Sequence, residues 1–317
     1  MSSKIAVYGA SGFTGGLVTA ELHRRGLSPI LIGRDRARLT ESAPPGAEIR
    51  VAGLDEPHAL AAAFRGLDVV INCVAPFTVW GERVLRGAIS AGATYLDTNG
   101  EQDYLARIFA GYGEAPTTIV PMVNDGGFLA DLLAGLTADG PVDELRLVHE
   151  TTGSALSRGS GRTALANLDS FTGGGLVYVD GTWRRDVPRE DPPGLTRFAM
   201  PEIITVPRHV RARRVEAFGK SALLRRFTAV TPEIVETLPE TRSEEARRSV
   251  HFGLTVDADG RRGTITGTDT YGTTAQVAAE VAIRVAGNGA PAGVLTPWQA
   301  VEPRDLLDSL DVSWAVG

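Results

Sequence analysis

Three glycines near the start of the chain constrain its fold more than any other feature. Residues 4–8 form a short apolar run, and Gly9, Gly12 and Gly15 follow it, ahead of apolar residues at helical spacing. A strand, a glycine-rich turn and a helix in this order open a dinucleotide-binding βαβ unit. The first glycine permits a sharp turn, the second lets the backbone approach a pyrophosphate, and the third lets the helix pack close to the strand. The helix N-terminus then attracts the phosphates.

The end of the second predicted strand bears on which dinucleotide binds. Residues 29–32 are apolar, and Gly33, Arg34 and Asp35 follow them. An acidic residue at this place accepts hydrogen bonds from the ribose of NAD, whereas an arginine suits the 2′-phosphate of NADP. Asp35 is well placed to cap a helix that starts at Arg36. Gly33 and Arg34 therefore predict NADP as the cofactor; the alternative is that Arg34 is a solvated loop charge.

Strands and helices continue to alternate over the first 127 residues. The pattern predicts strands over 48–54, 68–74, 94–97 and 117–121, and helices that end near Gly66 and cover 80–91. The near-continuous apolar character of 68–74 is typical of a parallel sheet covered on both faces. Ligands of such a sheet lie beyond the carboxyl ends of its strands. The candidate cofactor-binding residues are Gly9, Ser11, Gly12, Phe13, Thr14, Gly33, Arg34, Asn72, Val74, Ala75 and Pro76.

Taken together, these motifs resemble the NADP-binding domain of the saccharopine dehydrogenase-like reductases. The matching segments are 9–15, 33–35, 69–77 and 95–101, and residues 267–275 and 292–297 are similar to the closing segment of that family. The resemblance implies hydride transfer with NADP(H), with chemistry at C=N or C=C bonds of varied substrates. The lysine-rich catalytic features of true saccharopine-forming enzymes have no evident counterpart, because Lys4 and Lys220 are the only lysines. We therefore do not expect a role in lysine biosynthesis.

The pattern changes after residue 127. A helix is predicted near 128–138, and residues 143–150 then alternate as a strand does. Asp180-Gly181 and Asp259-Gly260 are hairpin turn signals between further alternating segments. We predict an α/β fold: a doubly wound parallel-sheet (Rossmann) domain over 1–127, and an α+β substrate domain over 128–271 on a mostly antiparallel sheet. Residues 272–317, with a helix near 273–286, are expected to return to the first domain and complete it.

Composition excludes several classes of protein. A length of 317 residues favours two domains, and a net charge of -6 argues against a general nucleic-acid binder. The chain has neither a signal-peptide pattern nor an apolar run of the roughly 18 residues that a membrane helix needs. Cys73 is the only cysteine, which excludes an intrachain disulfide and a cysteine-built metal site. We expect a cytoplasmic protein without a metal site and without membrane or nucleic-acid partners. The sequence leaves open whether the protein forms a homodimer.

Candidate catalytic groups lie where the predicted strands end. Glu101 and Asp97 follow a parallel strand beside the expected nicotinamide, and a carboxyl group there can protonate a substrate if burial raises its pKa. The alternative is that Asp97 binds backbone N–H groups in the turn before Gly100, and water can also supply the proton. His149, His209 and His251 lack ligand spacing and are predicted to be structural or exposed. The candidate catalytic residues are Glu101, Tyr271 and Asp125, and the candidate substrate-binding residues are Phe77, Gly100, Asn124, Arg158 and Arg162.

Two arginine-containing segments have alternative interpretations. Residues 157–163 precede a helical stretch, so Arg158 and Arg162 can bind an anion at a helix N-terminus; the alternative is a loop with ordinary capping. Ten arginines and Lys220 lie between Arg184 and Arg226. They are either a solvated sheet face or a docking patch for an acidic carrier protein that presents a tethered substrate.

We predict an NADP-dependent oxidoreductase that transfers a hydride to or from a small substrate in a cleft between the two domains. No nucleophile, metal cluster or second cofactor signature accompanies the nucleotide motifs. The alternative is a non-catalytic NADP-binding sensor or regulatory protein. The second domain argues against that alternative, because a sensor does not require a substrate-enclosing domain.

Overall fold

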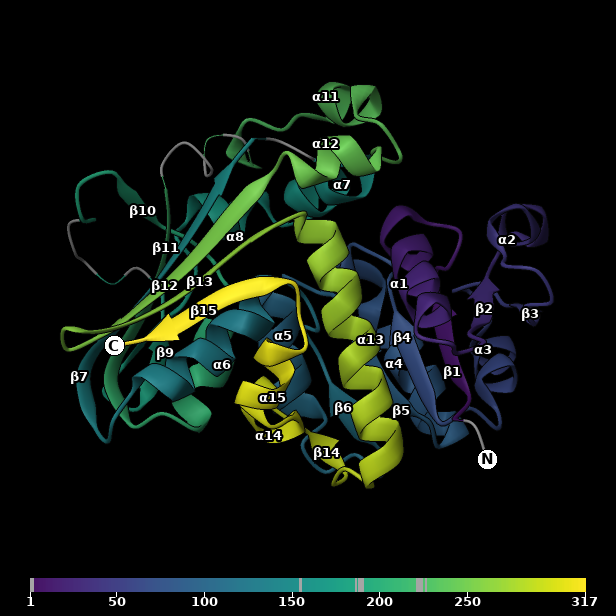
Figure 1. Ribbon diagram of the computed structural model, residues 1–317, viewed down its shortest axis with the longest axis horizontal. Helices are drawn as coiled ribbons and strands as arrows, with labels where there is room; N and C mark the ends of the chain where they lie inside the picture. The colour runs from purple at the N-terminus through teal and green to yellow at the C-terminus, as the bar shows by residue number, and fades with distance from the viewer. Residues whose placement is uncertain (1–2, 154–155, 186, 188–190, 221–224, 226) are drawn as a thin grey trace.

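The computed structural model describes residues 3–317, apart from 154–155, 186, 188–190, 221–224 and 226. Two sheets lie side by side in Figure 1, with the long helix α13 (Thr270–Asn288) between them. Within the described residues, every helix is too short or too polar to cross a membrane.

The first sheet is entirely parallel and confirms the predicted doubly wound architecture. Its strand order is β14-β6-β5-β4-β1-β2-β3, and each neighbouring pair is parallel. Because β1 lies between β2 and β4, the strand order reverses at β1, which is where such sheets bind ligands. The strands are β1 (Ile5–Tyr8), β2 (Ile30–Gly33), β3 (Ile49–Val51), β4 (Val69–Asn72), β5 (Thr94–Asp97), β6 (Thr118–Val120) and β14 (Gly293–Val294).

Helices cover both faces of this sheet because consecutive residues of its strands, which point to opposite faces, are buried and mostly apolar. Ile5 and Val7 of β1 pack into a core that includes α1 and α13, whereas Ala6 and Tyr8 pack into a second core with α3, α4 and α5. A parallel sheet buried on both faces requires this arrangement. The helices of this half are α1 (Phe13–Arg24), α2 (Arg36–Ser42), α3 (Pro57–Phe64), α4 (Phe77–Ala91) and α5 (Gln102–Gly111).

The second sheet is mostly antiparallel, as predicted. Its main order is β15-β13-β12-β7-β11-β8-β9, with β10 also paired to β11, and only β7 and β11 run parallel. The predicted turns at Asp180-Gly181 and Asp259-Gly260 join β8 to β9 and β12 to β13. The strands are β7 (Val142–Thr152), β8 (Val177–Val179), β9 (Thr182–Arg184), β10 (Leu195–Arg197), β11 (Ala212–Lys220), β12 (His251–Ala258), β13 (Arg261–Thr268) and β15 (Val312–Val316).

The helix α6 (Gly127–Thr137) joins the two halves. Nine of its eleven residues are buried, and it packs against β12 and β13 while belonging to the core that contains β1. Gly263 of β13 faces it so closely that a Cβ atom there would meet Leu133 Cδ1 at 2.8 Å. The other helices are α7 (Arg158–Ala166), α8 (Leu168–Thr172), α9 (Glu202–Thr205), the 3₁₀ helix η1 (Val206–Arg208), α11 (Pro232–Thr237), α12 (Glu244–Arg248), α14 (Pro297–Ala300) and α15 (Pro303–Asp308).

The C-terminal residues differ in part from the expectation that 272–317 return to the first domain. Helix α13 packs on α1, and β14 pairs with β6, as expected. The last strand, β15, instead pairs with β13 at the edge of the second sheet. The alternation of partly buried and exposed residues along Val312–Val316 fits a sheet edge, and this segment therefore corrects the expectation.

Candidate active site

The glycine-rich turn has the geometry that its spacing predicts. Gly9 has a φ of +84°, and a Cβ atom there would lie 2.6 Å from Val74 Cγ2. A Cβ atom at Gly15 would collide with the Gly9 carbonyl, so only glycine lets α1 approach the turn. Gly12 is the exposed N-cap of α1, where backbone can approach a ligand without a side chain between them.

The N-terminus of α1 fits a phosphate group. None of the described side chains caps this helix, and no acidic residue stands in its first turn. Free N–H groups and the positive end of the helix dipole therefore remain available for an anion. A pyrophosphate at this point satisfies donors that the chain itself leaves without a side-chain partner.

The segment after β2 separates the roles of Arg34 and Asp35. Asp35 Oδ1 accepts hydrogen bonds from Ala37 N at 2.9 Å and Arg38 N at 3.2 Å, which confirms the predicted helix cap. Arg34 is exposed, and no ion-pair partner for it is found among the described residues. Burial raises the pKa of Tyr8 to about 12, and the Arg34 charge opposes this rise. Arg34 is thus free to bind a ligand near the end of β1.

The segment after β4 lies against the glycine-rich turn. Asn72 is buried, accepts a hydrogen bond from Val74 N at 3.0 Å, and donates one to the Tyr95 hydroxyl at 3.0 Å. Val74 packs beside Gly9, and the bond between Ala75 and Pro76 is cis. The residues predicted after β1 and β4 are therefore neighbours in space, which is what a shared nucleotide site requires.

Glu101 is fully buried and holds the start of α4. Its carboxylate accepts hydrogen bonds from Phe77 N and Thr78 N, each at 2.7 Å. Both oxygens of this carboxylate are thus engaged by backbone N–H groups at a helix N-terminus. This geometry favours a structural role for Glu101 over that of a proton donor. Phe77 packs in the core beside Tyr104, with the ring centroids 5.8 Å apart, so its side chain does not face a substrate.

Asp97 and Asn124 arrange the loops after β5 and β6. Asp97 accepts hydrogen bonds from Met122 N at 2.9 Å and from the Tyr104 hydroxyl at 3.0 Å; burial raises its pKa. These contacts agree with the alternative prediction for Asp97, that its carboxylate binds backbone N–H groups. Asn124 accepts a hydrogen bond from Gly126 N at 3.0 Å and donates one to the carbonyl of Asn99. Both side chains shape the edge of the sheet, where Gly100 is exposed.

Asp125 is the carboxyl group best suited to proton transfer at this edge. Its Oδ1 accepts a hydrogen bond from the Thr274 hydroxyl at 2.9 Å, and that hydroxyl accepts one from Asp125 N at 3.2 Å. Burial raises the pKa of Asp125 to about 6, against the lowering effects of the Thr274 hydrogen bond and the charge of His149. A carboxyl group with this pKa exchanges a proton readily near neutral pH.

Tyr271 connects three segments around the glycine-rich turn. Its ring lies against Phe13, with centroids 4.7 Å apart. Its hydroxyl accepts a hydrogen bond from Ser157 N at 3.2 Å and is also bonded to the hydroxyl of Ser160. The structure therefore brings the starts of α1, α7 and α13 together.

Arg158 and Arg162 turn towards α11 and the loop after it. Arg158 donates hydrogen bonds to the carbonyl of Leu238 at 3.0 Å and to Glu240 at 3.1 Å. Arg162 pairs with Glu236 at 3.4 Å. Both guanidinium groups already have partners within the second half of the chain, which favours a structural role over binding of a substrate anion.

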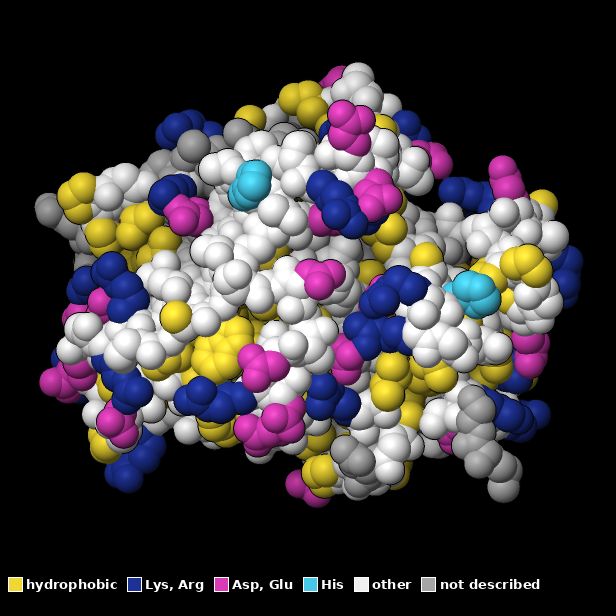
Figure 2. All heavy atoms as spheres, in the orientation of Figure 1, with side chains coloured by type: hydrophobic (Ala, Val, Ile, Leu, Met, Phe, Trp, Pro, Cys, Tyr) yellow, Lys and Arg dark blue, Asp and Glu magenta, His cyan; other side chains and the backbone are white. Residues whose placement is uncertain are grey.

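The arginines between 184 and 226 are largely paired. Arg197 and Arg214 contact the buried Glu216 at 2.9 and 2.8 Å, and Arg208 lies over the ring of Phe109. Figure 2 shows basic and acidic side chains interspersed over the face that it displays. Arg189 and Arg226 lie outside the described residues. This pairing favours a solvated surface over a docking patch for an acidic carrier.

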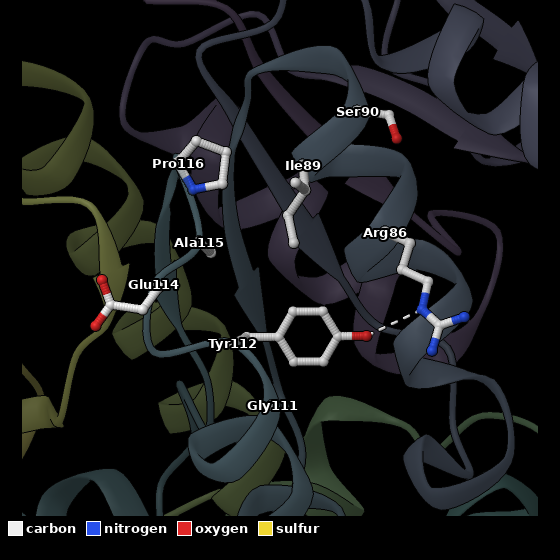
Figure 3. Close-up of a pocket in the computed structure, with 8 residues that line it drawn as sticks. All are labelled: Arg86, Ile89, Ser90, Gly111, Tyr112, Glu114, Ala115 and Pro116. Atoms are coloured by element: carbon white, nitrogen blue, oxygen red, sulfur yellow. Dashed lines mark hydrogen bonds between the residues drawn. The ribbon is translucent and has the colours of Figure 1, made fainter.

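Two surface hollows lie away from the glycine-rich turn. One of about 440 Å³ lies between α4 and the segment before β6, near the amino ends of the strands, where Arg86 Nε donates to the Tyr112 hydroxyl at 3.0 Å (Figure 3). The other, of about 700 Å³, lies on the second sheet at the ends of β7, β12, β13 and β15. No group of three or more potential ligands among the described residues is placed to hold a metal ion.

The sequence did not predict a buried pair formed by His149 and Glu202 near the loop after β6. The sequence predicts His149 to be structural or exposed and does not point to Glu202, yet His149 Nε2 lies 2.6 Å from Glu202 Oε1. The two residues are 53 positions apart, so no motif spacing could reveal them. The alternation of β7, which places His149 with Leu145 and Leu147 on the buried face, was the one available signal.

Comparisons with known proteins agree with this geometry. Residues 9–99 match a family described as "NAD(P)H-binding". The "Saccharopine dehydrogenase-like oxidoreductase" of Bos taurus is 29% identical over 208 residues, which are 58% of this chain and 45% of that protein. The "Probable mitochondrial saccharopine dehydrogenase-like oxidoreductase" of Arabidopsis thaliana is 32% identical over 125 residues, 34% of this chain and 28% of that protein. The matched part therefore spans less than half the length of these curated relatives.

A solved structure extends the similarity to the whole fold. Apo saccharopine dehydrogenase (L-Glu forming) from Saccharomyces cerevisiae has a TM-score of 0.59 with 12% identity, covering 99% of this chain and 100% of that one. At this identity the likeness concerns the fold alone. The resemblance to saccharopine dehydrogenase-like proteins is confirmed, and the comparisons support a nicotinamide dinucleotide as the cofactor.

Proposed function

We propose that this saccharopine dehydrogenase-like protein is an NADP-dependent oxidoreductase that transfers a hydride to or from a C=N, C=C or C=O bond of a small substrate. The observation that carries the proposal is the glycine-rich turn after β1, with the uncapped N-terminus of α1, at the point where the strand order reverses. This combination suits a pyrophosphate.

Preference for NADP over NAD follows from the end of β2. A ribose-binding carboxylate is the feature typical of NAD sites. The one carboxylate at this point, Asp35, is engaged with Ala37 N and Arg38 N, whereas Arg34 is exposed. A free guanidinium forms charge-assisted hydrogen bonds with a 2′-phosphate.

We assign the proton transfer of this reaction to a residue that follows β6. When bound, the nicotinamide supplies the hydride, and this chain must orient the substrate, exclude water and supply or accept a proton. The carboxyl ends of β4, β5 and β6 lie at the same edge of the parallel sheet as the glycine-rich turn, which is the edge where ligands of such sheets bind. Asp125 follows β6, and its pKa of about 6 allows its carboxyl to hold or release the proton near neutral pH. The second half of the chain presents the substrate in the proposed cleft.

A panel assay tests this proposal. The purified protein is mixed with NADPH or NADH and with imines, enones and 2-keto acids, and the loss of dinucleotide absorbance is followed. We expect at least one compound class to be reduced, faster with NADPH than with NADH. Tight NADPH binding without oxidation by any member of the panel would support a sensor instead. Failure to bind either dinucleotide would overturn the proposal entirely.

A further inference from the structure

A buried histidine–carboxylate pair lies beside Asp125. His149 on β7 is 6% exposed, and its Nε2 lies 2.6 Å from Oε1 of Glu202, which is fully buried on α9. The second carboxylate oxygen of Glu202 is also buried and has no hydrogen-bond partner among the described residues. Two titratable side chains are thus removed from water and joined through one hydrogen bond, an arrangement that carries a desolvation cost.

The imidazole faces the loop that carries Asp125. A Cβ atom built on Gly126, the next residue, would lie 3.9 Å from both Nδ1 and Cε1 of His149, so the ring abuts the loop backbone. The charge of His149 also acts on the Asp125 carboxyl, against the effect of burial. Glu202, His149 and Asp125 therefore follow one another from α9 to the carboxyl edge of the parallel sheet, in a chain that is hydrogen-bonded between Glu202 and His149 and runs past the Gly126 backbone to Asp125.

Few other charges face this chain. From the start of α13, Asp269 acts on Asp125 in the direction opposite to His149, and Asp269 itself is paired with Arg247 at 3.1 Å. Thr274, also on α13, is the hydrogen-bond partner of Asp125. Among these groups, His149 is the one whose positive charge acts on Asp125, and its ion-pair partner is Glu202.

A second histidine–carboxylate pair provides an internal comparison. His209 Nε2 lies 3.0 Å from Asp131 Oδ2, and Asp131 Oδ1 accepts a hydrogen bond from Trp298 N at 3.1 Å. The His209 ring is stacked on Trp298, with centroids 5.3 Å apart. Both oxygens of this carboxylate are satisfied, and the pair joins α6, α14 and the residue after η1. It is a structural pair, whereas the His149 pair keeps an unsatisfied oxygen and ends beside Asp125.

We propose that His149, oriented by Glu202, is a positioning residue that relays the proton to and from Asp125. This inference rests on the function proposed above. A carboxylate that accepts the Nε2 proton leaves the lone pair on Nδ1, the nitrogen that faces the Gly126 side. In the reduction C=X + NADPH + H⁺ → HC–XH + NADP⁺, the two electrons and one hydrogen arrive as hydride, and the carboxyl of Asp125 gives the proton to X. His149 then takes a proton from solvent at Nδ1 and passes it to the Asp125 carboxylate, which restores the neutral imidazole.

Carboxyl ¹³C NMR of Asp125 in the NADP-bound protein tests the coupling without a substrate. The titration midpoint of Asp125 should move upward by about half a pH unit or more in His149→Gln, because the variant lacks the imidazolium charge. His209→Gln, which alters the other pair, should leave the midpoint unchanged. Equal midpoints in the wild type and His149→Gln would overturn the relay.

A second measurement tests the wild-type protein first and a variant only afterwards. The ¹⁵N shifts of the wild-type histidines at pH 8 should show that the ring of His149 carries its proton on Nε2. In Glu202→Gln, the ring should no longer prefer Nε2 over Nδ1. Protonation at Nδ1 alone in the wild type would contradict the proposal, because the nitrogen beside Gly126 would then lack its lone pair.

Turnover separates the relay from the proposed function. With a substrate from the panel, His149→Gln should lower kcat about tenfold, with KM little changed and with the pH profile displaced as the Asp125 titration is. His209→Gln should retain at least half of wild-type kcat. Equal losses in both variants would overturn the relay while the function stands. Absence of NADPH oxidation by the wild type, with the NMR displacement still present, would overturn the proposed function instead.

Discussion

Asp125 is the residue at which burial and charge compete most clearly. Burial raises its pKa, and the Thr274 hydroxyl and the charge of His149 oppose that rise, so the carboxyl titrates at about 6 in the folded protein. Glu101 is equally close to the edge of the sheet but binds two N–H groups at 2.7 Å. The two carboxyl groups thus differ in environment: Asp125 is suited to proton exchange, and Glu101 holds the start of a helix.

The raised pKa of Asp125 predicts a pH-dependent loss of stability. Its value rises from 3.8 to about 6 on folding, so the stabilisation is fully present below pH 4 and is lost as the pH rises through about 6. About two pH units correspond to roughly 3 kcal/mol. Asp125→Asn, which keeps an oxygen for the Thr274 hydroxyl, should therefore gain stability relative to wild type between pH 4 and 7. Urea unfolding at pH 4 and at pH 7 measures the stability of both proteins. A stability difference between the variant and wild type that is the same at both pH values would refute the prediction.

Arg34 should decide the preference for NADP. Arg34→Ala removes the guanidinium proposed to bind the 2′-phosphate, so NADPH affinity should fall about tenfold while NADH affinity stays nearly the same. Fluorescence titration with each dinucleotide measures both affinities. Arg65→Ala, an exposed arginine after α3, serves as the control and should change neither. Equal losses for NADPH and NADH would show that Arg34 supports its loop.

At the scale of elements, the start of α1 should be sensitive to a side chain at one position. Gly12→Val places a branched side chain where the pyrophosphate approaches, so NADPH affinity should fall at least tenfold, about 1.4 kcal/mol. Gly16→Ala, one turn along the helix, meets only an ordinary contact at 3.7 Å and should bind as wild type does. Titration of NADPH distinguishes the two, and an unimpaired Gly12→Val would show that the phosphates bind elsewhere.

Elements that depend on neighbouring residues were predictable, and those that depend on distant ones were not. The strand–turn–helix at 5–24 and the Asp35 cap follow from adjacent residues and are confirmed. No local pattern reveals that Glu101 binds the start of α4, because its partners Phe77 and Thr78 lie 24 and 23 positions away. The same reason applies to β15, whose pairing with β13 the sequence did not indicate.

At the scale of the whole molecule, α6 and α13 make one core out of two sheets. Residues of β1, α6, β12 and β13 belong to the same cluster of buried side chains. A core shared in this way predicts that the two sheets unfold together. It also positions the second sheet relative to the nucleotide site, since α13 carries both Tyr271 and Thr274.

A single glycine at this junction should therefore affect the stability of the entire chain. Gly263→Ala places a Cβ atom against Thr137 and Leu133 of α6, and we expect a loss of about 1 to 3 kcal/mol. Gly111→Ala, which meets open space at the end of α5, should cost nothing by comparison. Urea unfolding followed by fluorescence and by circular dichroism should show one coincident transition in both variants. Separate transitions for the two halves would contradict the shared core.

Transfer of a deuterium label tests the central claim most directly. NADPH with both hydrogens of the nicotinamide C4 replaced by deuterium is supplied with a substrate from the panel, and the product is examined by mass spectrometry. The proposed hydride transfer predicts one deuterium per product molecule, at the carbon of the reduced bond. When unlabelled NADPH reacts in deuterated water, that carbon should carry no deuterium. A product without the label, or turnover that continues without any nicotinamide dinucleotide, would contradict the account.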